Sequence, residues 1–231
     1  MTDTKKAASG LHVGFILDGN RRWAKEKGLS AKEGHKKGFE NFRKIADACL
    51  ERGVSYLSVF AFSTENWNRS KDEVNFLMGF IQVVIKKYIA DLKKKNIRFV
   101  WLGSGEGLDK KIVKLLRSAE QESINNTAGT ICLCFNYGGQ QEIADAAAVL
   151  AEKKMPITTE TLSGEMYGGK DIPAVDLIIR TSGEQRLSNF MLWRAAYSEL
   201  FFSDKYWPDF STIDLDEALT DYENRKRRFG K

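Results

Sequence analysis

The sequence has no hydrophobic run long enough to cross a membrane. Its longest apolar stretch, residues 76–85, is interrupted by Gln82 and followed by two lysines, whereas a membrane-spanning helix needs about 20 consecutive apolar residues. Residues 1–10 are polar, and the apolar segment 11–17 is too short for the core of a signal peptide. These absences predict a cytoplasmic protein.

Cysteine is scarce as well, with only Cys49, Cys132 and Cys134 in the chain. An odd number of cysteines does not make a complete set of disulfides. Two cysteines that share one face of a strand are too few ligands for a structural zinc site. We therefore expect all three to be reduced thiols buried in the core.

No linker, internal repeat or low-complexity segment divides the chain, which predicts a single domain over residues 1–231. Hydrophobic residues make up 42% of the sequence, enough to bury a sizeable core. Residues 1–11 are expected to form a disordered tail in front of that domain.

A concentrated stripe of basic charge is also missing. The 36 lysines and arginines are spread among 31 aspartates and glutamates, for a net charge of +5. Nucleic-acid binding favours a clustered basic face, so we expect no nucleic acid partner. The densest basic run, Arg225–Arg228, lies at the C-terminal end and suits contact with a membrane surface, a partner subunit or solvent.

Apolar runs alternate with helical patterns along the chain, while residues 155–172 show no clear period. The expected strands are 13–17, 55–62, 97–102, 130–135, 175–179 and 199–202, and the expected helices are 37–52, 71–94, 110–124, 140–153, a short one from Asn189, and 215–228. This alternation predicts an α/β domain with a mainly parallel sheet of about six strands, covered by helices on both faces.

Polar and basic residues follow three of the expected strands: residues 18–22, 63–69 and 180–188. In a parallel sheet these loops meet at one edge, where ligands bind. Asp18 is placed to hold a divalent cation, and the arginines beside it suit phosphate oxygens, so the pattern favours a metal-bound phosphate or diphosphate. The alternative is that each loop is a solvated turn and Asp18 a helix cap.

Seven motifs, in matching order over residues 12–230, resemble those of the cis-prenyltransferases, the undecaprenyl diphosphate synthase family. They are 18–24 (DGNRRWA), 34–35 (GH), 61–69 (AFSTENWNR), 136–139 (NYGG), 179–184 (IRTSGE), 186–190 (RLSNF) and 207–210 (WPDF). The Asp-Asp-x-x-Asp motif of the all-helical trans-prenyltransferases is absent.

The resemblance implies a Mg²⁺-dependent transferase that condenses isopentenyl diphosphate sequentially onto an allylic diphosphate primer, such as farnesyl or geranylgeranyl diphosphate. The product is a Z polyprenyl diphosphate. Asp18 and Glu199 are the implied metal ligands. Asn66 occupies the position to which the family assigns proton removal, but a neutral amide is a poor base, so we favour a positioning role with a diphosphate oxygen taking the proton.

The same resemblance implies a set of substrate-binding residues. They are Gly19, Asn20, Arg21, Arg22, Trp23, His35, Ser63, Thr64, Glu65, Trp67, Arg69, Arg180, Arg186, Leu187 and Ser188. Arg22 and the amides after Gly19 would hold the allylic diphosphate, and Arg180, Arg186 and Ser188 the isopentenyl diphosphate. Two positions depart from the family pattern: Ala31, with Lys32 beside it, stands where many relatives carry arginine, and Gln185 where some carry histidine.

A prenyl tail needs a dry tunnel. The candidates to line it are Phe76, Leu77, Met78, Phe80, Ile81, Val84 and Ile85, facing Ile131, Leu133 and Phe135, with Gly79 leaving room; the alternative is that they only pack the core. The C-terminal Arg228-Phe229-Gly230 resembles a motif that reaches the neighbouring active site. It implies a homodimer. Peripheral contact at the inner face of the membrane, for product release, is a separate expectation.

Two other functions remain open. One is a non-catalytic partner subunit, as some members of the family are. Such subunits tend to lose the metal carboxylate and loop arginines, whereas Asp18, Arg22, Arg180, Arg186 and Glu199 are all present. The other is a generic phosphoester hydrolase, which would release phosphate without chain growth.

Overall fold

A computed structural model describes residues 10–225 and shows one six-stranded parallel sheet. The strands are β1 (His12–Ile16), β2 (Tyr56–Ser63), β3 (Ile97–Leu102), β4 (Gly129–Tyr137), β5 (Leu177–Arg180) and β6 (Glu199–Phe202), in the order β3-β4-β2-β1-β5-β6. Every neighbouring pair is parallel. The predicted fold class is therefore confirmed.

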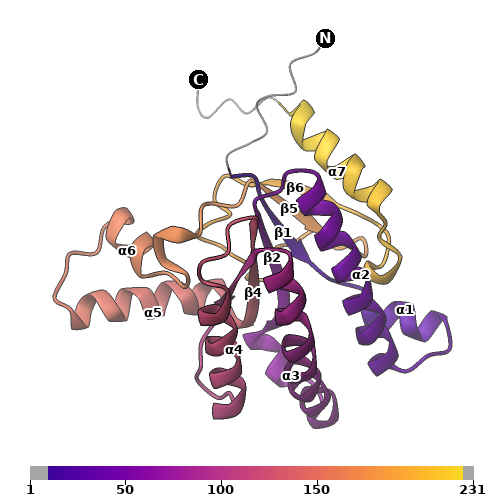
Figure 1. The fold of residues 1–231 in the computed structure, drawn as a ribbon, viewed down its shortest axis with the longest axis horizontal. Helices are drawn as coiled ribbons and strands as arrows, with labels where there is room; N and C mark the ends of the chain where they lie inside the picture. Colours follow the sequence, from indigo (N-terminus) through magenta and orange to yellow (C-terminus); the bar gives the residue numbers. More distant parts are fainter. Residues whose placement is uncertain (1–9, 226–231) are drawn as a thin grey trace.

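Six α-helices connect these strands within residues 10–225, and a seventh, α7, follows β6 (Figure 1). They are α1 (Asn20–Glu26), α2 (Ala31–Glu51), α3 (Lys71–Lys94), α4 (Lys110–Ser123), α5 (Gly139–Glu152), α6 (Thr159–Glu165) and α7 (Thr212–Asn224), with short 3₁₀ turns η1 (Thr64–Asn68), η2 (Gly169–Asp171) and η3 (Trp207–Asp209). The segment 155–172, without clear period in the sequence, thus carries α6 and η2.

Capping explains where two helices begin earlier than predicted. The Ser30 hydroxyl accepts a hydrogen bond from the backbone of Glu33, and the Glu33 side chain accepts one from the backbone of Ser30, so α2 starts at Ala31. Ser211 and Asp214 form the same reciprocal pair at the start of α7. Polar residues before the apolar pattern therefore extend both helices.

The predicted helix from Asn189 does not form, and this prediction is wrong. Ser188, Asn189 and Met191 all have positive φ angles, of 50°, 66° and 45°. A right-handed helix requires negative φ at every residue, so the segment is instead a series of turns.

Apolar side chains pack on both faces of the sheet. Phe15 of β1 belongs to a large cluster that includes residues of α2, α3, α4 and α7. The opposite face carries a second cluster, in which Phe60 of β2 stacks on Phe190 with ring centroids 4.9 Å apart. Cys132 and Cys134 lie in that second cluster, and all three cysteines are buried and free, as predicted.

The connections place a ligand crevice beside β1. From β1 the chain continues to β2 on one side, and β5 lies on the other side. Ligands of open α/β sheets bind outside the carboxyl ends of the strands where the order reverses in this way. The loops after β1, β2 and β5, which carry the predicted site residues, therefore share one edge.

Some predictions fall on residues that the structure does not describe. Arg228-Phe229-Gly230 and most of the 1–11 tail lie outside residues 10–225, although Leu11 accepts backbone hydrogen bonds from Ser55 and Tyr56. Among the helices of the described part, none is long and apolar enough to span a bilayer.

Candidate active site

An ion pair joins Asp18, in the loop after β1, to Arg180, the last residue of β5. Arg180 Nη2 donates to Asp18 Oδ2 at 2.9 Å, Arg180 Nη1 donates to Ser188 Oγ at 2.8 Å, and the Gly19 amide donates to Asp18 Oδ1 at 2.7 Å. Gly19 has a φ of 103°, and a Cβ there would lie 2.7 Å from the Tyr206 ring. Only glycine allows this turn.

The Asp18 carboxyl is ionised at neutral pH. Its partial burial would raise the pKa, but the hydrogen bond and positive charge of Arg180 outweigh that effect, so the pKa lies below its ordinary value. The Arg180 side chain is only 4% exposed, whereas that of Asp18 is 31% exposed. The arginine is thus fixed in place, while the carboxylate faces solvent.

Two further arginines meet at Glu184 on the same edge. Arg22 donates to Glu184 at 3.1 Å and to the Ser182 hydroxyl at 2.5 Å, and Arg186 donates to Glu184 at 2.6 Å. The side chains of Arg22 and Arg186 are 44% and 58% exposed. Both guanidinium groups are therefore accessible to an anionic ligand.

The loop after β2 contributes a second charge cluster around Glu73 of α3. Its carboxylate accepts from Arg69 at 2.8 Å, pairs with Arg21 at 3.3 Å and lies 3.4 Å from His35 Nε2. Burial would raise the pKa of Glu73, but these two arginines hold it below its ordinary value. Glu73 is not among the residues predicted for the site, so its ion pairs were not predicted.

Asn66 and Trp67 are held by hydrogen bonds of their own. The Ser63 amide donates to Asn66 Oδ1 at 3.2 Å, and Trp67 Nε1 donates to Asn136 Oδ1 at 2.7 Å. Both side chains are therefore held at the start of the loop after β2, and Asn66 also lines the second hollow described below.

These loops enclose two adjoining hollows. The first, of about 650 Å³, is lined by residues 17–22 together with Lys25, Ala31 and Arg69. The second, of about 530 Å³, is lined by Ser63, Glu65, Asn66, Arg180, Ser188 and Asn189. Leu17, Asp18 and Arg69 line both, so Asp18 stands at their boundary.

The Lys32 side chain, beside Ala31, lies over an aromatic ring. Its ammonium group lies 5.6 Å from the centroid of the Phe76 ring, and Lys32 is not among the residues that line the first hollow. Lys25 of α1 does line that hollow. The sequence did not indicate that Lys25 and not Lys32 lines the first hollow, since this depends on the direction of each side chain.

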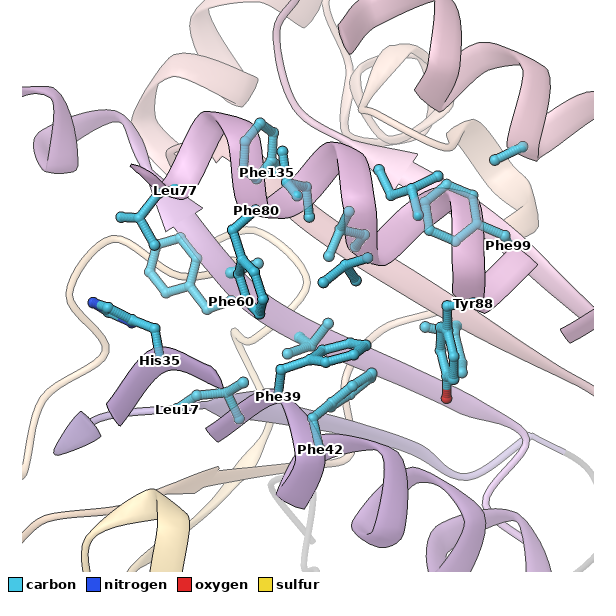
Figure 2. Close-up of a pocket in the computed structure, with 18 of the residues that line it drawn as sticks. Leu17, His35, Phe39, Phe42, Phe60, Leu77, Phe80, Tyr88, Phe99 and Phe135 are labelled. Carbon is cyan, nitrogen blue, oxygen red and sulfur yellow. The ribbon is translucent and has the colours of Figure 1, made fainter. Parts of the chain in front are cut away.

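An apolar cavity adjoins both hollows, sharing Leu17 with each. Figure 2 shows it running from Leu17 and His35 to Tyr88 and Phe99. Among the predicted lining residues, Leu77, Phe80, Ile81, Val84, Ile85, Ile131, Leu133 and Phe135 do line it. Phe76 and Met78 do not, and Gly79 faces a separate surface groove.

The cavity has a volume of about 150 Å³. An engineered apolar cavity of that size accepts benzene, so by volume this one has room for about one five-carbon unit, and a longer prenyl chain needs the lining side chains to move apart.

Glu199 does not join Asp18 within one chain. It is the first residue of β6 and pairs with Leu177 at the start of β5, whereas Asp18 follows the carboxyl end of β1. Arg225 donates to the Glu199 carboxylate at 2.9 Å. The two implied metal ligands therefore lie toward opposite edges of the sheet, and residues 10–225 contain no cluster of three or more His, Cys, Asp or Glu suited to a metal.

Other predicted residues support the loops without lining either hollow. Trp23 is buried and donates to Asp209 at 2.9 Å, and Leu187 packs on the second core cluster. Thr64 packs against Gly138.

A family model described as "Putative undecaprenyl diphosphate synthase" matches residues 16–230. The chain belongs to this family. The enzyme class and reaction predicted from the sequence motifs are thereby confirmed: the protein is a cis-prenyltransferase that condenses isopentenyl diphosphate onto an allylic diphosphate primer.

Individual relatives of this cis-prenyltransferase cover nearly all of it. It is 45% identical to isoprenyl transferase 2 of Corynebacterium glutamicum, over 95% of this chain and 93% of the relative. It is 47% identical to the trans,polycis-polyprenyl diphosphate synthase ((2Z,6E)-farnesyl diphosphate specific) of Thermobifida fusca, over 95% and 80%. The structure of lavandulyl diphosphate synthase from Lavandula x intermedia, in complex with dimethylallyl diphosphate, superposes with a TM-score of 0.89 at 35% identity, covering 95% and 98%.

The cis-prenyltransferase site has one carboxylate that suits a magnesium ion. Mg²⁺ is commonly bound through one or two carboxylates together with substrate phosphates and waters. Asp18 is ionised, partly exposed and at the boundary of the two hollows. Each of its oxygens has lone pairs beyond those used by Gly19 and Arg180. The residue therefore fits the ion.

Proposed function

We propose that this cis-prenyltransferase uses Asp18 to hold Mg²⁺, binds its allylic primer, such as farnesyl or geranylgeranyl diphosphate, in the first hollow, and works as a homodimer. The observation that carries the proposal is the Asp18–Arg180 pair, which lies where the two hollows and the mouth of the apolar cavity adjoin. One boundary carboxylate between two hollows that both contain arginines suits a reaction between two diphosphates.

The first hollow suits the allylic diphosphate. Arg22 and Lys25 supply positive charge there, and the turn at Gly19 brings backbone close to a ligand. When bound, Mg²⁺ would neutralise negative charge on the departing diphosphate. Asp18 contributes an ionised oxygen for the ion, and Arg22 a guanidinium that stabilises the leaving group as its charge grows.

The second hollow suits isopentenyl diphosphate. Arg180 and Ser188 line it, and Arg186 stands beside it on the same loop. Holding this substrate there directs its double bond at the allylic carbon. The allylic carbon–oxygen bond breaks as the new carbon–carbon bond forms, and a diphosphate oxygen accepts the proton that is lost. Asn66 orients the reactants.

The apolar cavity suits the growing prenyl tail. Its lining of Phe, Leu, Ile and Val side chains excludes water. Exclusion of water favours attack by the isopentenyl double bond over hydrolysis of the allylic diphosphate. Chain growth, and not phosphate release, is therefore the expected outcome.

Incubation of the purified protein with Mg²⁺, farnesyl diphosphate and labelled isopentenyl diphosphate tests this function. We expect label in a polyprenyl diphosphate whose mass rises in five-carbon steps, and loss of incorporation with a chelator. Phosphate release without chain growth would instead identify a phosphoester hydrolase. Activity only after another subunit is added would identify a non-catalytic partner.

The homodimer has its own test, because it is implied by the resemblance of Arg228-Phe229-Gly230 to the family motif. Removing residues 226–231 should lower incorporation strongly. Mixing that truncated chain with full-length Asp18→Ala should then restore activity, since the intact tail of one subunit completes the intact hollows of the other. Absence of restoration together with a monomeric mass by light scattering would refute the shared site.

A further inference from the structure

Asn189 links three of the loops at the active edge of the sheet. Its Nδ2 donates to Glu65 Oε1 at 2.8 Å, which ties it to η1 after β2. Its Oδ1 accepts from the Gln140 amide at 2.8 Å, and its carbonyl accepts from the Gly139 amide at 2.7 Å, which tie it to the start of α5 after β4. Asn189 itself belongs to the loop after β5.

The glycine pair after β4 makes room for this linkage. A Cβ at Gly138 would lie 2.6 Å from Thr64 Oγ1 and 2.8 Å from Asn189 Nδ2. A Cβ at Gly139 would lie 2.8 Å from a Leu192 side-chain atom and 3.0 Å from the Asn189 carbonyl oxygen. Real Cβ atoms do not approach so closely, so both glycines are explained by the close approach of the Asn189 loop.

The backbone of Asn189 also fixes the position of Ser188. Both residues have left-handed φ angles, 66° and 50°, a conformation that asparagine tolerates better than most residues. The Ser188 hydroxyl accepts from Arg180 at 2.8 Å. Anchoring Asn189 to α5 therefore holds the Ser188 hydroxyl and the Arg180 guanidinium in the second hollow.

The charge of Glu65 determines which side chain fits at position 189. Burial would raise the pKa of Glu65, but hydrogen bonds from Asn189 and from the neighbouring Ser63 and Thr64 lower it below its ordinary value. Asn189 thus lies between an N–H donor, Gln140, and a carboxylate acceptor. Only an amide presents an oxygen to the first and an N–H to the second.

We propose that Asn189 is a positioning residue for isopentenyl diphosphate: by joining Glu65, Ser188 and the start of α5, it sets the shape of the second hollow. The assignment of that hollow to isopentenyl diphosphate rests on the proposed function. Asn189, Glu65 and Ser188 do not line the first hollow. Loss of the linkage should therefore affect one substrate much more than the other.

The first test is Asn189→Gly, which removes the amide but keeps the left-handed backbone accessible. Losing a hydrogen bond to a charged group should raise the KM for isopentenyl diphosphate about tenfold and leave the KM for the allylic primer within about twofold. Asn96→Gly is the matched control: Asn96 also has a positive φ, 55°, and its amide bonds Thr127 at 3.0 and 3.2 Å, distant from the site at the start of β3. Its KM values should stay unchanged.

An exchange of the two side chains gives a second test. Asn189→Asp places two carboxylates face to face and should raise the KM for isopentenyl diphosphate more than Asn189→Gly does. Adding Glu65→Gln to Asn189→Asp restores a donor and an acceptor in reversed order. The KM of the double variant for isopentenyl diphosphate should return to within about threefold of that of Glu65→Gln alone. A double-mutant cycle measures this coupling between the two side chains.

Equal changes in both KM values, or additive effects in the cycle, would overturn the proposal. Wild-type protein in the same assay separates this result from a failure of the proposed function. If the wild type does not elongate the primer, the function is refuted. If it does and Asn189→Gly binds isopentenyl diphosphate normally, only the role of Asn189 is refuted.

Discussion

Replacing Asp18 by asparagine separates the charge of this side chain from its shape. In Asp18→Asn the new amide oxygen still accepts from the Gly19 backbone, but the new amino group cannot accept from Arg180, which in the wild type donates at 2.9 Å. Removing one partner of a fully buried pair costs about 3–5 kcal/mol. The Asp18 side chain is 31% exposed, and Arg180 keeps its hydrogen bond to Ser188. We therefore expect the free energy of unfolding to fall by about 1–2 kcal/mol.

The loss of activity should be much larger than the loss of stability. Removal of the charge that holds the metal takes away stabilisation of the diphosphate as it departs. Electrostatic contributions of this kind are worth about 10²- to 10³-fold in rate. We therefore expect turnover to fall by about 10²- to 10³-fold, whereas 1–2 kcal/mol lowers the Tm of a domain of this size by only about 2–8 °C.

The assay is incorporation of labelled isopentenyl diphosphate at saturating Mg²⁺, beside thermal denaturation of the same preparation. Asp216→Asn is the matched control, since Asp216 also pairs with an arginine, Arg52, at 2.9 Å, but on the exposed surface. Asp216→Asn should change neither the turnover nor the Tm measurably. An unchanged rate in Asp18→Asn, with the fold intact, would remove Asp18 from the mechanism.

Three further predictions concern the primer, the product and acid stability. Lys25→Ala should raise the KM for the primer several-fold, whereas Lys32→Ala should not, because only Lys25 lines the first hollow; equal effects would show that Lys32 reaches it. Ala119→Leu, which adds volume to the wall of the apolar cavity, should shorten the product by about one or two five-carbon units in mass spectra of the extracted polyprenols. The pKa of Glu73 is lowered on folding from its ordinary value of 4.5, so its stabilisation is fully present above that value and is lost as pH falls through the folded pKa. Urea unfolding between pH 6 and 3 should therefore show a smaller acid loss in Glu73→Gln than in the wild type, and an equal loss would contradict the ion-pair assignment.

Local sequence signals predicted the elements that depend on nearby residues. Three elements have the predicted bounds: β3 and β6, from their apolar runs, and α3, from its long helical pattern. The predicted helix from Asn189 failed because Asn189 is held in a left-handed conformation by partners in η1 and α5. Those partners are distant in sequence, so no local pattern predicts them.

The same distinction applies to the site. The shared position of Asp18, Arg22, Asn66, Arg180 and Ser188 was predictable because each lies at or after the end of a recognisable strand, and parallel strands bring their carboxyl ends to one edge. Glu199 could not be placed in this way, since it begins its strand and the sheet register puts it at the other edge. Motif resemblance identifies a residue type at a position, but it does not say which neighbours surround that position in one chain.

Carboxylates accompany the cations at the active edge. Arg180 pairs with Asp18, Arg22 and Arg186 share Glu184, and Arg69 and Arg21 share Glu73. Unpaired, these guanidinium groups would repel one another across a few ångströms. A diphosphate must therefore exchange partners with carboxylates that already hold the arginines in place. The affinity for a diphosphate is therefore lower than unpaired arginines would give. The ion pairs also fix the orientation of the arginines before substrate arrives, so less ordering of these side chains is required on binding.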